Sequence, residues 1–340
     1  MAVTIIDVAK KAGVSPSTVS RVITGSSRIS PQTTERIRTI MDELGYVPNS
    51  IAKSLVSKTT NSIGLVLPKP AEELFLNHFF SELIRGILTQ CSRAEIDLMM
   101  TTGATEREEV DAVSRLVRGR KVDGILLLYS RKEDPTIEFL QKQDFPFVLV
   151  GRSNYETPIY TVDTDNKQAA FDATRHLIDQ GHQRIGFVSG PPNLVISEDR
   201  KEGYLKALES AGLPLRPEWI LEGDFLQESG YRAMSIIMSQ PERPTAFVVI
   251  DDMVAFGVLR GLTELGVRVP QDISLVGFNN IAVTELTSPP LTSIDIGIYE
   301  LGYTASQLLH KIVKGEPASQ NRLIIPHRLI VRESSLFRVN

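Results

Sequence analysis

The chain has 340 residues, of which 42% are hydrophobic and 23% are charged, values typical of a globular protein with two or three domains. No apolar run reaches the ~18 residues that a membrane-spanning helix needs, and no basic-then-apolar leader opens the chain. The single cysteine, Cys91, excludes an internal disulfide, so we expect a cytoplasmic protein without membrane contact.

Charge is unevenly distributed along the chain, whose formal net charge is −4. Residues 1–60 carry eight Lys and Arg against four Asp and Glu, whereas the rest carries 29 against 37. A basic head on an acidic body is typical of a DNA-binding module joined to a second domain with another task.

Residues 4–23 predict two short helices joined by a tight turn. Thr4 is a suitable N-cap for the first helix, with Asp7 in the capping-box position, and Gly13 ends it. Ser15 caps the second helix and Pro16 opens it, where a missing N–H group costs nothing.

The outer face of this second helix carries small hydroxyl groups and one arginine. The face consists of Pro16, Ser17, Thr18, Ser20 and Arg21. Arginine can bind a guanine edge through two hydrogen bonds, while Ser and Thr reach phosphates or bases, so the pattern favours a DNA-reading helix. An ordinary solvated helix hairpin is the alternative.

A third helix is predicted from Ser30 to Gly45, followed by a short helix over 51–56 and a polar linker.

The runs AGVSPSTVSRVI, RISPQTTERIRTIMDELGYVPNSIAKSL and VPQDISLVGFNN resemble the LacI/GalR family of bacterial transcription regulators. The resemblance implies a helix-turn-helix domain over 1–47, a hinge helix and linker over 48–60, and an effector-binding and dimerisation domain over 61–340. It also implies that a homodimer binds a palindromic operator, with the hinge leucine parting a central base step in the minor groove. The DNA-binding residues would be Thr4, Ser15, Pro16, Ser17, Thr18, Ser20, Arg21, Asn49, Ala52, Lys53 and Leu55.

From residue 62 onward, buried apolar strands alternate with amphipathic helices, which indicates parallel sheets covered on both faces. Strands are expected over 62–68, 97–101, 122–129, 147–150, 160–162, 184–189, 246–250, 274–278 and 329–331. Two doubly wound subdomains of this kind resemble a type I periplasmic-binding-protein fold, with chain crossovers near 155–165, 280–296 and 322–332. A ligand is expected in the cleft between them, at the carboxyl ends of the strands.

Enzyme motifs are scarce in the body. The five histidines lack metal-binding spacing, so no metal, cofactor or catalytic residue is predicted. Asp251 and Asp252 allow a catalytic carboxylate pair. The favoured interpretation is instead a ligand acceptor beside the start of a helix, with Asp252 as the natural cap of that helix.

Polar side chains instead gather at predicted strand–helix junctions, as a sugar site requires. These are Ser189, Arg200 at the opening of the next helix, Asp251 and Asn279, with Phe79, Phe80, Tyr129 and Phe225 as candidate aromatic platforms. Phe79 and Phe80 could instead be core residues, and Arg200 a surface cation. The family resemblance assigns Arg200 to effector binding, adds Ile298 to the pocket, and marks Asn279 as a position where many relatives carry aspartate.

The runs NHFFSELIRGI, TTGATEREE and RLVRGRKVDGILLLYSRKEDP resemble the maltose-operon repressors of Gram-positive bacteria. This implies a dimeric repressor, paired near residues 80–92 and 107–118, which maltose or a maltodextrin releases from DNA. A catabolite-control regulator with a phosphocarrier protein as corepressor is one alternative. A sugar-binding transport receptor and a sugar-modifying enzyme are alternatives from other classes.

Overall fold

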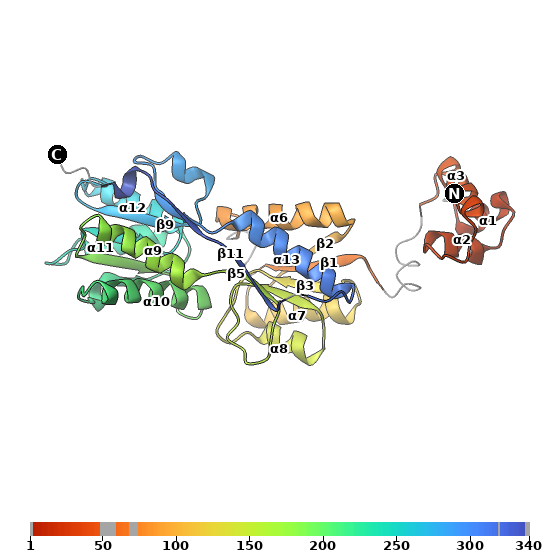
Figure 1. The fold of residues 1–340 in the computed structure, drawn as a ribbon, viewed down its shortest axis with the longest axis horizontal. Coiled ribbons are helices and arrows are strands. Elements are labelled where there is room, and N and C mark those ends of the chain that lie inside the picture. The colour runs from red at the N-terminus through yellow and green to blue at the C-terminus, as the bar shows by residue number, and fades with distance from the viewer. Residues whose placement is uncertain (1–2, 48–58, 68–73, 319, 337–340) are drawn as a thin grey trace.

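The computed structural model describes residues 3–47, 59–67, 74–318 and 320–336. The described residues form a small helical N-terminal domain and a body of two α/β subdomains (Figure 1). The fold class predicted from the sequence is therefore confirmed. Among the described residues, no helix combines the length and apolar character needed to cross a bilayer.

The N-terminal domain consists of α1 (Ile5–Ala12), α2 (Pro16–Ile23) and α3 (Pro31–Leu44). Its helix ends form where the sequence predicts them. Gly13 ends α1 with a φ of 63°, and the Ser15 hydroxyl accepts a hydrogen bond from the Thr18 N–H over 3.2 Å. Buried Val8, Val19 and Ile37, one from each helix, hold the domain together. The predicted hinge helix, with Asn49, Ala52, Lys53 and Leu55, lies outside the described residues.

The first subdomain is built on a wholly parallel sheet in the order β11-β5-β4-β3-β1-β2. The strands are β1 (Ser62–Leu67), β2 (Asp97–Thr102), β3 (Gly124–Leu127), β4 (Phe147–Val150), β5 (Thr161–Thr164) and β11 (Arg322–Ile325). The helices around it are α6 (His78–Ala94), α7 (Glu106–Arg118), α8 (Pro135–Lys142) and α13 (Ile298–Val313).

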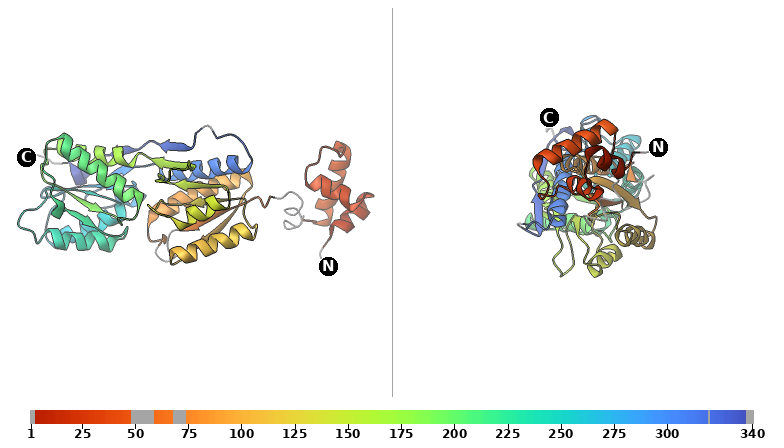
Figure 2. Two further views of the ribbon diagram at one scale, coloured as in Figure 1. Left: turned by 90° about the horizontal axis from the view of Figure 1, so that it is seen from below. Right: turned by 90° about the vertical axis from the view of Figure 1, so that its right-hand side faces the viewer.

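The second subdomain is built on a sheet in the order β12-β10-β9-β8-β6-β7, in which, among the described strands, β12 alone runs antiparallel to its neighbour. The strands are β6 (Ile185–Ser189), β7 (Ile220–Glu222), β8 (Ala246–Val249), β9 (Ser274–Phe278), β10 (Thr292–Asp295) and β12 (Arg328–Ile330). Its helices are α9 (Asn166–Asp179), α10 (Val195–Ser210), α11 (Gln227–Ile237) and α12 (Asp252–Glu264). Figure 2 shows both sheets layered between helices.

Three chain crossings join the subdomains. The chain leaves the first sheet after β5, returns between β10 and α13, and crosses again between β11 and β12. Helix α13 can pack closely on α6 because glycines stand at the contact: a Cβ at Gly86 would lie 2.2 Å from the Tyr299 carbonyl oxygen, and one at Gly302 would lie 2.1 Å from that of Leu83. This contact seats α13, which follows the second crossing, on the first subdomain.

Three of the described strands were not predicted from the sequence: β7, β10 and β11. Each has only three or four residues and includes a charged one, so its apolar run is short; the charged residues are Glu222, Asp295 and Arg322. Strands β7 and β11 lie at the ends of their described sheets, where pairing with a single neighbouring strand defines them. These strands depend on backbone pairing with distant segments, which local hydrophobic patterning does not report.

Candidate functional site

Helix α2 presents the side chains predicted for DNA reading at the surface of the N-terminal domain. Pro16, Ser17 and Arg21 are exposed, whereas Thr18 and Ser20 are half-buried. The Ser15 hydroxyl caps the helix and lies 2.8 Å from that of Ser17. No carboxylate of the described residues forms an ion pair with Arg21, so its guanidinium is available to an anionic or acceptor-rich partner.

Thr4 lies exposed at the start of α1. Its N–H and its hydroxyl both donate to Asp7 Oδ2, over 2.9 and 2.7 Å. These bonds lower the pKa of the Asp7 carboxyl and fix the first turn of the helix. Thr4 therefore has a structural role in addition to the predicted DNA contact.

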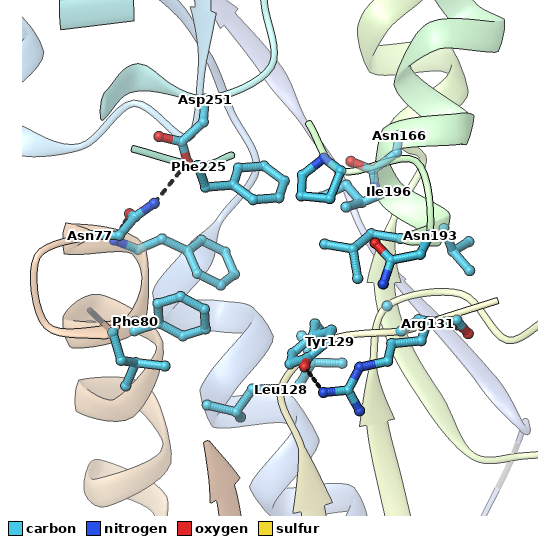
Figure 3. A pocket seen from close by; sticks show the side chains of 18 of the residues that line it. Asn77, Phe80, Leu128, Tyr129, Arg131, Asn166, Asn193, Ile196, Phe225 and Asp251 are labelled. Carbon is cyan, nitrogen blue, oxygen red and sulfur yellow. Dashed lines mark hydrogen bonds between the residues drawn. The ribbon is translucent and has the colours of Figure 1, made fainter. Parts of the chain in front are cut away.

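A cavity of about 580 Å³ lies between the two subdomains of the body (Figure 3). Its walls come from both of them, at the loops that follow the carboxyl ends of the strands. Seven of the predicted effector residues line it: Phe79, Phe80, Tyr129, Arg200, Phe225, Asp251 and Asn279. Segments far apart in sequence thus meet at one site of a size typical for small-molecule ligands.

Ser189 and Ile298 are not among the cavity-lining residues. Ser189 is the last residue of β6 and is 3% exposed, so it remains within the sheet, while Pro191 and Asn193 beyond it reach the cavity. Ile298 is buried at the start of α13, and its neighbours Ile296 and Leu301 line the cavity in its place.

Arg200 is almost completely buried in the cavity wall. Helix α10 begins at Val195, so Arg200 lies in its second turn and does not open the helix, and the surface-cation alternative is wrong. Its Nε donates to Asn166 Oδ1 over 2.9 Å, its Nη1 donates to the Ile250 carbonyl, and its guanidinium lies 4.1 Å from the centre of the Phe278 ring. Burial lowers the pKa of Arg200 to about 10, which leaves it cationic at neutral pH.

One nitrogen of that guanidinium is without a partner. Arg200 Nη2 is buried and has no hydrogen-bond acceptor among the described residues. A buried, unpaired donor on a charged group is costly, and a ligand oxygen in the cavity would satisfy it.

Asp251 and Asp252 face different surroundings. Asp251 caps α12 by accepting from the Met253 N–H over 2.7 Å, and its other oxygen accepts from Asn279 Nδ2 over 2.7 Å. Asp252, predicted as the cap, is instead the first helical residue, accepts from the Ser293 hydroxyl over 2.7 Å and lies outside the cavity lining. Burial raises the pKa of both carboxyls. Because each carboxyl binds different partners, the two do not form a catalytic pair.

Contacts across the cleft join the two subdomains. Asn77 Nδ2 of the first subdomain donates to Asp251 Oδ2 of the second over 3.2 Å, as the dashed line in Figure 3 shows. The Val195 N–H donates to the Ser130 carbonyl over 3.1 Å, and Arg152 forms a two-pronged ion pair with Asp199, both distances being 2.8 Å. The described arrangement is therefore a cleft closed by direct contacts.

Several cavity residues were missed by sequence reasoning. They are Asn77, Glu109, Arg131, Arg152, Asp163, Asn166 and Asp199. Arg131 and Arg152 follow predicted strands just as Asp251 and Asn279 do, so the same rule could have found them. The acids lie within helices or strands, and only the tertiary structure turns them toward the cavity.

Asp163 gives a prediction on pH dependence. Burial raises the pKa of this cavity carboxyl to about 6, so the folded protein binds its proton more tightly than the unfolded chain does. The resulting stabilisation is complete below about pH 4 and is lost as the pH rises through 6. Wild type should therefore lose up to ~3 kcal/mol of unfolding free energy as the pH rises from 4 to 7.5, a loss that Asp163→Asn should not show. Urea unfolding at a series of pH values measures this, and a constant difference between the two proteins would contradict it.

Comparisons with known proteins agree with this division into a helical domain and a cleft-forming body. Residues 4–49 match the model of bacterial regulatory proteins of the lacI family, and residues 174–335 match a periplasmic binding protein-like domain. The chain is 35% identical to catabolite control protein A of Priestia megaterium, over 98% of this chain and all of that protein.

Two solved structures extend the comparison. One is a lac repressor dimer bound to operator and an anti-inducer, 29% identical, with a TM-score of 0.87, covering 99% of this chain and 100% of that one. The other is a probable maltose operon transcriptional repressor of Staphylococcus aureus, 29% identical, with a TM-score of 0.75, covering 82% and 98%.

Proposed function

Since the chain belongs to the lacI family of bacterial regulatory proteins, we propose that it is a repressor that binds a palindromic operator as a homodimer and is released by a small sugar, with maltose or a maltodextrin as the first candidate. The single observation that carries the sugar assignment is the unpaired Nη2 of buried Arg200 in the cleft wall. The protein is a transcriptional regulator and not an enzyme.

DNA binding is assigned to the exposed face of α2, with Arg21 as its base-reading side chain. A helix of eight residues offers few base contacts, and helix-turn-helix proteins of this kind bind as two-fold dimers on two half-sites. The likeness to a lac repressor dimer on its operator supports the same arrangement for this chain.

The cavity suits a neutral sugar. Phe79, Phe80, Tyr129 and Phe225 provide aromatic surface for the apolar faces of sugar rings. Arg200 supplies an unpaired donor, and Asp251 and Asn279 supply polar groups beside it. The likeness to a probable maltose operon repressor favours maltose as the ligand, and a cavity of about 580 Å³ accommodates a ligand of disaccharide size.

Release follows from thermodynamic linkage between the two sites. A sugar that binds better to the state with weak operator affinity shifts the protein toward that state, and operator weakens sugar binding by the same factor. The cleft contacts, including Asn77 with Asp251, are the elements through which a ligand would bias the two subdomains.

The sign of the response separates this proposal from the catabolite-control alternative, which the likeness to catabolite control protein A favours. Operator sites can be selected from a random DNA library with the full-length protein, and operator affinity then measured by fluorescence anisotropy with a panel of sugars. Maltose or a maltodextrin should weaken binding. Tightening by a phosphorylated carrier protein, with no effect of any sugar, would favour the alternative instead.

Leu55 belongs to the predicted hinge helix, which lies outside the described residues. If two Leu55 side chains part a central base step, Leu55→Ala should weaken specific operator binding and reduce DNA bending, because the cost of unstacking is no longer offset. Sugar affinity should not change. Gel mobility of permuted sites measures the bend, with Leu55→Met as a control that keeps an apolar wedge. Equal bending by the alanine variant would exclude the wedge.

A further inference from the structure

Among the described residues that line the cavity, acidic side chains outnumber basic ones. The basic side chains are those of Arg131, Arg152 and Arg200. The acidic side chains are those of Glu106, Glu109, Asp163, Asp199, Asp224 and Asp251. A phosphorylated ligand needs an unneutralised cation, so the state of each arginine decides which ligands can enter.

Arg131 is neutralised by the protein. Its Nη2 donates to Glu109 Oε2 over 2.7 Å and to the Tyr129 hydroxyl, and its Nη1 donates to Glu109 Oε1 and Asp134 Oδ2 over 3.1 and 3.3 Å. Its Nε lies 3.7 Å from Glu106 Oε1. Guanidinium has five N–H groups, and each nitrogen here already faces an oxygen.

Arg152 is neutralised in the same way. Its Nε and Nη2 each donate to one oxygen of Asp199 over 2.8 Å, and its Nη1 donates to Asn154 Oδ1. Asp199 is 2% exposed, and Lys167 also lies 3.8 Å from it. This arginine too has an oxygen beside each of its three nitrogens.

Arg200 keeps one unpaired nitrogen, which suits a single hydroxyl oxygen better than a phosphate dianion. Asp251, which also lines the cavity, is among the charges that act on it. A dianion placed here would meet carboxylates with only one guanidinium unpaired among the described cavity residues, and such like-charge neighbours strongly disfavour binding.

We propose that the cleft selects uncharged, hydroxyl-rich sugars and rejects their phosphate esters, with Glu109 and Asp199 as the specificity-determining residues. They act by neutralising Arg131 and Arg152, the two arginines that would otherwise hold a phosphate. This inference rests on the proposed sugar-binding function and names the class of sugar that the site accepts.

The first test is calorimetry on the full-length protein with matched ligands: maltose against maltose 6′-phosphate, and trehalose against trehalose 6-phosphate. In each pair that binds, the phosphate ester should bind at least about 100-fold more weakly, as expected for like charges in a partly dehydrated site. A phosphate ester that binds as tightly as its neutral partner overturns this inference while leaving the proposed function standing. Binding of the esters alone overturns both.

The second test weakens the selectivity. Glu109→Gln keeps the shape of the side chain but leaves Arg131 with less negative charge, and Asp199→Asn does the same for Arg152. Each should raise the affinity for the phosphate ester relative to the neutral sugar by about 10-fold. Glu108→Gln is the matched control, because Glu108 is exposed on the same helix and does not line the cavity. Unchanged ratios in both folded variants overturn the assignment of Glu109 and Asp199.

Discussion

Replacement of Arg200 by methionine should strongly weaken the binding of sugar while operator affinity stays near that of the wild type. Methionine fills much of the same volume but cannot donate hydrogen bonds, so the variant lacks the unpaired Nη2 that we expect to bind a ligand oxygen. A hydrogen bond from a charged donor contributes ~1.5–3 kcal/mol, which corresponds to a loss of sugar affinity of roughly 10- to 150-fold. Calorimetry measures the sugar affinity, and anisotropy with labelled operator measures DNA binding.

The same variant leaves Asn166 Oδ1 and the Ile250 carbonyl without their donor, so stability must be checked separately by urea unfolding. Arg232→Met is the matched control, because Arg232 lies exposed on α11 outside the cavity and should leave both affinities unchanged. Unchanged sugar affinity in a folded Arg200→Met protein would show that the ligand binds elsewhere.

Replacement of Arg21 by alanine should weaken specific operator binding by ~1–3 kcal/mol in each half-site, and binding to random DNA by much less. Arg21 is the only cation on the exposed face of α2, and no described carboxylate occupies its guanidinium. Because base contacts distinguish sequences and phosphate contacts do not, the ratio between operator and random DNA is the decisive measurement.

Arg28→Ala provides the comparison for this test. Arg28 is exposed in the loop between α2 and α3 and is not one of the residues predicted to read bases, so its loss should weaken binding to all DNA sequences about equally. Equal losses on operator and random DNA for Arg21→Ala would instead make Arg21 a phosphate contact.

Much of the N-terminal domain is determined by its own sequence. Ser15, Pro16 and Gly13 act on backbone groups within a few residues of themselves, so helix boundaries follow from short-range chemistry alone. The same holds for the buried strands of the body, whose continuous apolar runs require cover on both faces. Asp251 and Asn279 follow two of those strands, so the order of residues along the chain is enough to assign them to the cleft.

Only the tertiary structure decided which side chains meet in the cleft. Asn77 meets Asp251 although 174 positions separate them, and Glu109 on α7 neutralises Arg131, which follows a neighbouring strand. It also decided that Ser189 remains in its sheet while Pro191 reaches the cavity. Local patterns specify which residues are apolar or capping, but charge neutralisation and ligand access depend on which distant side chains the packed sheets and helices bring together.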